Sequence, residues 1–426
     1  MLKFKFSKTK QANTMANKIT QKTVILPISA SKYSIFITNN KIAHQIIRQI
    51  YKKTPDLFPS EMSSGYCLNG KTKLSKKSGI RMRRIKIGSE TYQIRPSYIL
   101  AYQKEKVSLA SKGLFLYKFG VPFWALAHVF GYNPMWWYRL FISLGKYDII
   151  GTSIYEAKKI PQDLLADEHH IYVKGQKKYV ATTAGADCFL GMSVCHRASE
   201  KSLEKGYSIF KEEVLKLDKN YKPSTVNTDG WKATQNAWKN LFPNIVIIEC
   251  FLHAFLKIRN RATKKLAFFF DIAADKAWNC YRAETKRSLA QQLRRFREWT
   301  LKNVPKSPMK EAISKLWTKK DRWMKHFDNP KAKRTSNMLD RLMRLMKKHK
   351  INSQMFHSDI EATTMNFRAF ALIHNFAPSS PNTWKKEPNF KSPVARLNKK
   401  IYAENWLENL IISNKRAYFV YQHKLL

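Results

Sequence analysis

The strongest constraint on the fold is the order of short apolar runs between residues 163 and 253. The strand-like segments are 163–175, 177–196, 224–230 and 244–253, and the helix-like segments are 201–219 and 231–242. The predicted order along the chain is three strands, a helix, a strand, a helix and a last strand. This order predicts an α/β domain. From about residue 262 to 376 the pattern is helical and rich in tryptophan, lysine and arginine.

Net charge indicates the class of partner. The 426 residues include 78 Lys and Arg against 30 Asp and Glu, a formal charge of +48 at pH 7. Such one-sided charge repels itself unless a polyanion neutralises it, so we expect nucleic acid first and an anionic membrane surface second. Hydrophobic residues make up 44% of the chain, enough for buried cores, which excludes a largely disordered basic protein. The length predicts roughly three domains.

Cysteine usage and hydropathy indicate the compartment. Five cysteines, an odd number without regular spacing, do not suit a disulfide framework, so we expect a reducing environment. The basic N-terminal segment lacks the apolar run of a signal peptide, and no stretch approaches the roughly 18 apolar residues that cross a bilayer. We therefore expect a soluble intracellular protein that does not enter a membrane.

The N-terminal region, residues 1–100, alternates short β-prone runs with Gly, Ser and Lys. It contains GYCLNGKTKLSKKSGIRMRRIKIG, which predicts a basic module with a β-hairpin. Arg81, Arg83 and Arg84 in this stretch are candidate phosphate contacts, with a solvated basic surface as the alternative.

Residues 101–150 predict two short helices separated by Gly131, a candidate helix-turn-helix. Trp137 and Arg139 on the second helix are candidate DNA contacts, and an ordinary packed helical hairpin is the alternative. The last segment, residues 381–426, begins with many prolines and lysines, which predicts a poorly ordered basic tail.

Because acidic residues are scarce, those at strand ends are informative. Asp167 lies in the first strand-like run, and Asp229 follows an apolar run directly before a helix. Carboxylates in such places hold the divalent cations that phosphoryl transfer requires, although a turn or helix cap explains each one separately. A third carboxylate is either Asp340 or Glu361. Both have capping-box spacing, so the residues alone leave the choice open.

Several of these residues occur together in a pattern that resembles a known family. Asp167, Asp229 with the following Gly230 and Trp231, Cys250-x-x-His253, and the run Thr335–Asp340 (T-S-N-x-x-acid) resemble DDE-type transposases, in particular bacterial insertion-sequence and Mutator-like enzymes. The resemblance implies a ribonuclease H-like core, residues 160–262 and 333–380, interrupted by an all-α insertion, residues 263–332. It also implies that the upstream helix-turn-helix binds DNA ends.

The third carboxylate of that family follows the Asn of the T-x-N motif by three residues, which implies Asp340 and a D-D-D set, with Glu361 as second choice. The three aspartates would then hold two Mg²⁺ or Mn²⁺ ions. The implied activity is cleavage of double-stranded DNA at the ends of a mobile element and transfer of the freed strand into target DNA. The implied setting is a homo-oligomer on DNA, in a bacterial cytoplasm and associated with the nucleoid.

Supporting roles follow from the same resemblance. Cys250 and His253 would pack and form hydrogen bonds near the active site rather than hold zinc. Trp278, in the insertion, is a candidate for stacking on a base, with a core tryptophan as the alternative. Arg341 and Arg344 flank Asp340 and are, from that position, candidate phosphate contacts, with a solvated helix surface as the alternative. The alternatives are a catalytically inactive, transposase-derived DNA-binding protein and a ribonuclease H-like nuclease.

Overall fold

The computed structural model describes residues 22–101, 103, 105–353 and 356–423, and every structural statement below refers to them. The N-terminal residues in which a signal peptide was not expected lie outside this range. The chain forms two compact units. One combines the residues up to Lys159 with those from Leu372 onward, and the other is Ile160–Ala371.

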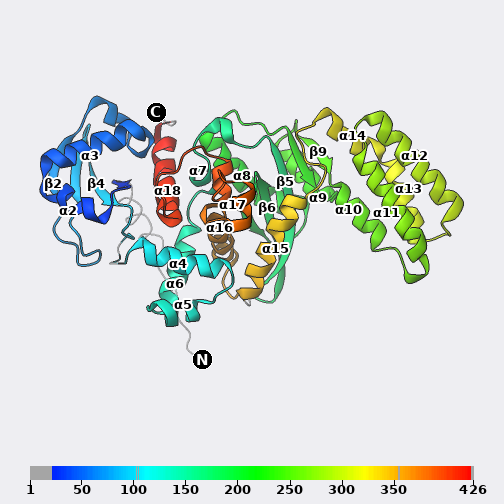
Figure 1. Cartoon of the computed structure of the whole chain (residues 1–426), viewed down its shortest axis with the longest axis horizontal. Helices are drawn as coiled ribbons and strands as arrows, with labels where there is room; N and C mark the ends of the chain where they lie inside the picture. The colour runs from blue at the N-terminus through cyan, green and yellow to red at the C-terminus, as the bar shows by residue number, and fades with distance from the viewer. Residues whose placement is uncertain (1–21, 102, 104, 354–355, 424–426) are drawn as a thin grey trace. The chain divides into compact units, whose positions relative to one another are not determined.

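The second unit is built on a mixed five-stranded sheet (Figure 1). Its strands are β5 (Asp163–Val173), β6 (Gln176–Gly185), β7 (Cys188–Cys195), β8 (Thr225–Thr228) and β9 (Val246–Glu249), in the order β7-β6-β5-β8-β9. The first three strands are antiparallel, whereas β8 and β9 run parallel to β5. With helices α8 (Glu200–Leu217) and α9 (Lys232–Leu241) between β7, β8 and β9, the element order predicted from the sequence is confirmed.

Tight turns and side-chain alternation set the register of the sheet. Lys174 and Gly175, both with positive φ, form the two-residue loop between β5 and β6, as the right-handed twist of a hairpin favours. On one face of β5, Glu168 accepts hydrogen bonds from Tyr207 of α8 and Thr234 of α9. On the other face, Thr182, paired with Asp167, contacts Met346 of α15 (Asn337–Asn352). Helices therefore cover both faces.

Five helices lie between β9 and α15. They are α10 (Phe251–Arg259), α11 (Ala267–Arg282), α12 (Lys286–Asn303), α13 (Pro308–Thr318) and α14 (Lys320–Asp328), which Figure 1 shows packed together. They share a core of their own, which includes Ile258, Leu293, Phe296, Met309 and Ile313. Helices were predicted for this interval, and the separate core makes it a subdomain of the second unit.

The N-terminal part of the first unit contains the predicted hairpin within a four-stranded sheet. Strands β1 (Thr23–Leu26), β2 (Cys67–Lys71), β3 (Arg83–Ile87) and β4 (Glu90–Pro96) are in the order β1-β4-β3-β2. Helices α2 (Ala30–Thr38) and α3 (Asn40–Lys53) lie between β1 and β2 in the sequence, and neither was predicted.

Arg83 was expected to be a candidate phosphate contact, and the structure corrects this expectation. Its side chain is buried, and it donates to the carbonyl oxygens of Phe36 and Ile37 and to Oδ1 of Asn40, at 2.7–2.9 Å. Arg83 therefore joins β3 to α2 and α3 and is not a phosphate contact.

Three helices follow: α4 (Val107–Lys118), α5 (Phe123–Phe130) and α6 (Pro134–Leu144). The two short helices expected around Gly131 are present as α5 and α6. Trp137 is fully buried, lies against Gly113 and donates to the carbonyl oxygen of Gly131 at 3.1 Å. Trp137 is thus a packing residue, which corrects its assignment as a DNA contact, whereas Arg139 is exposed.

The expectation of a poorly ordered tail is wrong for the described part of residues 381–426. Helices α17 (Pro381–Lys386) and α18 (Trp406–His423) form there, and α18 buries Leu407, Leu410 and Ile412. The buried guanidinium of Arg416 donates to the carbonyl oxygens of Gly151, Ile154 and Tyr155.

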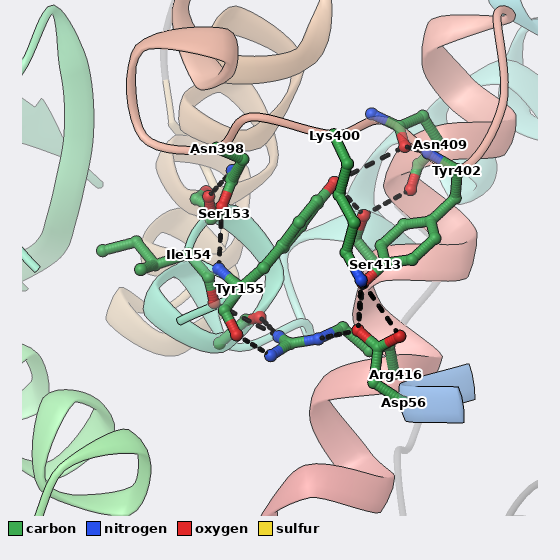
Figure 2. Close-up of polar contacts among 11 residues, drawn as sticks. Asp56, Ser153, Ile154, Tyr155, Asn398, Lys400, Tyr402, Asn409, Ser413 and Arg416 are labelled. Carbon is green, nitrogen blue, oxygen red and sulfur yellow. Dashed lines mark hydrogen bonds and ion pairs between the residues drawn. The ribbon is translucent and has the colours of Figure 1, made fainter. Parts of the chain in front are cut away.

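Figure 2 shows how this C-terminal segment is held within the first unit. The carboxylate of Asp56 accepts from Lys400, Tyr402 and Arg416, which belong to the segment that was expected to be disordered. Of these three partners, Arg416 is buried, and the loss of a partner of a buried charge is costly because it leaves that charge uncompensated. The C-terminal segment is therefore an integral part of the N-terminal unit. Among the described residues, no helix is both long and apolar enough to cross a membrane.

Candidate active site

Asp167 and Asp229 come from neighbouring parallel strands. Leu165 of β5 pairs with Asn227 of β8, and the two aspartates each lie two residues further along the chain, Asp167 within β5 and Asp229 directly after the last residue of β8. The amide of Glu168 donates to Oδ1 of Asp167 at 2.8 Å, and the amide of Trp231 donates to Oδ1 of Asp229 at 2.8 Å. These local hydrogen bonds fix the orientation of each carboxylate at the same edge of the sheet.

Asp340 comes from the first turn of α15. Its amide donates to the carbonyl oxygen of Ser336 at 2.8 Å, and the Ser336 hydroxyl donates to Oδ2 of Asp340 at 3.0 Å. Ser336 is the N-cap residue and the helix begins at Asn337, although the spacing of Asn337 and Asp340 allowed Asn337 as the cap. The predicted capping box between Asn337 and Asp340 is therefore not formed.

Two of the aspartates act electrostatically on the third. The pKa of Asp167 is raised to about 6, first by burial and then by the negative charges of Asp229 and Asp340, while the Glu168 amide and His253 oppose the rise. Neighbouring like charges favour the protonated form of a carboxyl group, and a cation between them would relieve that repulsion. The structure thus brings the three predicted aspartates into one electrostatic environment.

Glu361, the second choice for the third carboxylate, lies elsewhere. It is exposed in the first turn of α16 (Ile360–Phe376). Asp359, not Ser358, caps this helix, because its Oδ1 accepts from the amide of Ala362 at 2.7 Å. The spacing of Ser358 and Glu361 allowed a capping box, and the structure has the Asp359 cap in its place. Of the two candidates for the third carboxylate, Asp340 is therefore the one that acts on Asp167.

Cys250 and His253 connect the end of β9 to Asp340. Cys250 is buried at the start of α10, and its Sγ lies 3.2 Å from both the amide nitrogen and the hydroxyl of Ser336. The pKa of His253 is raised to about 9, first by its interaction with Cys250 and then by Asp167 and Asp340, while burial opposes the rise. Hydrogen bonds therefore run from Cys250 through Ser336 to Asp340, and His253 interacts electrostatically with Cys250, Asp167 and Asp340.

The donor set fits a hard divalent cation. Three carboxylates supply oxygen ligands, which Mg²⁺ and Mn²⁺ prefer, and their mutual repulsion favours a cation among them. Across the chain as described, no group of three or more His, Cys, Asp and Glu side chains is already arranged to hold a metal ion. Asp167, Asp229 and Asp340 are the residues that would hold it.

Two structural carboxylates beside the site escaped the sequence analysis. Burial raises the pKa of Glu168 to about 7, even though Tyr207 and Thr234 donate to it at 2.7 and 2.8 Å. Glu249, paired in register with Thr228, accepts from Arg322 of α14 and thereby joins the helical insertion to the sheet. A carboxylate at the end of the apolar run VIIE was the signal for Glu249.

The remaining DNA-binding candidates occupy different environments. Arg81 is exposed and Arg84 is half-buried, both in the first unit. Trp278 is half-buried, and its ring packs against Phe255 and Tyr281 at centroid distances of 5.2 and 5.5 Å, so its contacts are those of a packing residue.

Helix α15 presents a basic surface beside Asp340. Arg341 and Arg344 are exposed, and Arg341 pairs with Asp187 at 2.8 Å. His169 shares the Asp167 face of β5, and its pKa is lowered to about 4 by burial and then by the charges of Lys350 and Lys347. Positive charge therefore gathers next to the acidic cluster, as a site for an anionic backbone requires.

Two comparisons with known proteins found no match. No protein-family model matches the chain, and no curated protein matches it. The functional interpretation therefore rests on the geometry and electrostatics of the residues described above.

Proposed function

We propose that this chain is a DDE-type transposase, here with a D-D-D set, that cleaves DNA at the ends of a mobile element and transfers the strand into target DNA. The observation that carries the proposal is the convergence of Asp167, Asp229 and Asp340 from a strand, the end of its parallel neighbour and a later helix. The other two carboxylates raise the pKa of Asp167, which is the environment that a divalent cation stabilises.

The topology supports the same proposal. Three antiparallel strands are followed by two parallel ones, with a helical insertion between β9 and the helix that carries Asp340. This arrangement agrees with a ribonuclease H-like core whose last acidic residue follows a long insertion. We infer that fold for the second unit.

The chain's own residues would bind and orient the reacting groups. Asp167, Asp229 and Asp340 would hold the cations, and Ser336, backed by Cys250, fixes one oxygen of Asp340. Two bound Mg²⁺ or Mn²⁺ ions would supply activation of the attacking oxygen and neutralisation of charge on the leaving 3′ oxygen. The basic surface of α15 would hold the DNA backbone beside these carboxylates.

The test is a cleavage and strand-transfer assay on DNA that carries the gene's own flanking sequences, with and without Mg²⁺. We expect Asp167→Asn, Asp229→Asn and Asp340→Asn each to reduce the rate by at least about a thousandfold, because a ligand to the reacting centre is lost. Glu361→Gln is the matched control and should retain activity.

Three outcomes would revise the proposal. Full activity of Asp340→Asn would remove the third ligand. Metal-dependent hydrolysis without joining would favour a ribonuclease H-like nuclease. Tight DNA binding without any cleavage by the unmodified chain would favour a catalytically inactive DNA-binding protein.

A further inference from the structure

Three aromatic side chains lie on one side of the second unit, on the face of the β5–β6 hairpin opposite Asp167. Tyr172 pairs with Lys177 and His170 pairs with Tyr179, so side-chain alternation places all four on the same face. Trp231, at the N-cap of α9, meets Tyr179 with ring centroids 6.4 Å apart. We call Tyr172, Tyr179 and Trp231 the aromatic platform.

The platform is open to solvent. Tyr172 is 51% exposed and Trp231 is 40% exposed, whereas Trp238 and Trp323 of the same unit are buried. Trp231 contributes no side-chain cap to α9, so helix formation does not explain its position. Exposed aromatic rings that serve neither core nor cap are typical of a binding surface.

Positive charge accompanies the rings. The Nζ of Lys177 lies over the ring of Tyr179, 5.5 Å from its centroid, and Lys174 at the hairpin turn and Lys232 beside Trp231 are exposed. The carboxylate on this face, Glu168, is already bound by Tyr207 and Thr234. Rings interleaved with lysines match the chemistry of single-stranded nucleic acid, whose bases stack while its phosphates pair with cations.

The platform is also joined to the candidate active site. The amide of Trp231 donates to Asp229, one of the three converging carboxylates, at 2.8 Å. The platform therefore begins two residues from Asp229, at the same edge of the sheet as the candidate active site.

We propose that Tyr172, Tyr179, Trp231 and Lys177 form a stacking site for unpaired bases of the DNA strand next to the reacting phosphate. This role deepens the proposed function and rests on it for the link to catalysis. The binding of unpaired DNA is a separate property, which is measurable without cleavage.

The experiment measures fluorescence anisotropy of labelled DNA with the full chain in EDTA. Two probes share one duplex sequence, and one of them carries an unpaired thymine tail. Trp231→Ala and Tyr172→Ala should each weaken binding of the tailed probe by about tenfold, because base stacking on an aromatic ring has this magnitude. The same variants should change binding of the blunt duplex less than twofold.

Two controls separate stacking from other effects. Trp231→Phe keeps an aromatic ring and should restore most of the affinity for the tailed probe. Phe268→Ala removes a 72% exposed ring on α11, away from the platform, and should change neither affinity. Thermal unfolding of each variant shows whether it folds. If Trp231→Ala does not fold, Tyr172→Ala alone tests the stacking site.

Equal losses on tailed and blunt DNA, or unchanged binding of the tailed probe by both alanine variants, would overturn the stacking site. Because no divalent cation is present, the absence of catalysis would leave this result unaffected. Conversely, if the chain is active in strand transfer and the platform variants bind tailed DNA normally, the stacking site is refuted and the proposed function is not.

Discussion

Asp167 should destabilise the folded protein at neutral pH when no divalent cation is present. Its pKa in the folded state, about 6, lies above the ordinary value of 3.8, so the folded state binds the proton more tightly than the unfolded state. Stability is therefore lost as pH rises between the two values. The raised pKa of Asp167 therefore lowers the free energy of unfolding by about 3 kcal/mol at pH 7.5 and by about 1 kcal/mol at pH 4.5.

Asp167→Asn removes that cost and keeps the hydrogen bond from the Glu168 amide, because the amide oxygen of Asn accepts it equally. We therefore expect the variant to be about 3 kcal/mol more stable than the unmodified chain at pH 7.5, and about 1 kcal/mol more stable at pH 4.5. Urea-dependent hydrogen exchange of peptides from β5 and β6 reports the opening free energy of the unit that contains Asp167.

Asp271→Asn, at an exposed position on α11, is the charge-matched control and should show no such pH dependence. Added Mg²⁺ should narrow the gap at pH 7.5 by stabilising only the unmodified chain. A gap that is equal at the two pH values, or a less stable Asp167→Asn at pH 7.5, would refute the raised pKa of Asp167.

Three further changes test other parts of the structure. Ser336→Ala should raise the Mg²⁺ concentration for half-maximal strand transfer about tenfold and Ser336→Thr should not, because the hydroxyl orients Asp340; equal effects of both variants would contradict this role. Arg416→Ala should lower the stability of the first unit by about 3 to 5 kcal/mol in hydrogen exchange, against less than about 1 kcal/mol for the exposed Lys400→Ala, and similar losses would count against the buried network. Burial lowers the pKa of His349 to about 4. The neutral imidazole therefore contributes to the free energy of unfolding above pH 6.5, and this contribution is lost as the pH falls toward 4. Exchange of α15 peptides should show about 2 kcal/mol lower stability at pH 5 than at pH 7, and a similar difference in His349→Gln would assign it to other groups.

The sheet of the second unit was predictable because its strands and helices each follow one regular period. The runs at 163–175 and 224–230 alternate or are continuously apolar, and the helix at 201–219 repeats apolar residues at helical spacing. The expectation that Asp167 and Asp229 share one site followed from their positions on, or directly after, strands that were expected to be adjacent. Asp340 was chosen over Glu361 by family resemblance alone, since both had the same local spacing.

Other features depended on information that local sequence does not contain. Arg83 shares its alternation with Ile85 and Ile87, so its burial was readable, but the acceptors on α2 and α3 that satisfy it come from more than 40 residues earlier. The C-terminal segment was misjudged because its prolines and lysines precede an apolar helix whose partners lie in the first half of the chain. The bonds of Glu168 and Ser336 likewise join residues distant in sequence.

A titration of Mn²⁺ into the full chain without DNA, with the free ion followed by electron paramagnetic resonance, shows directly whether Asp167, Asp229 and Asp340 form one cation site. We expect the unmodified chain and Glu361→Gln to bind Mn²⁺ alike, and Asp167→Asn, Asp229→Asn and Asp340→Asn each to weaken binding about tenfold or more. Unchanged affinity in Asp340→Asn together with lost affinity in Glu361→Gln would contradict this expectation.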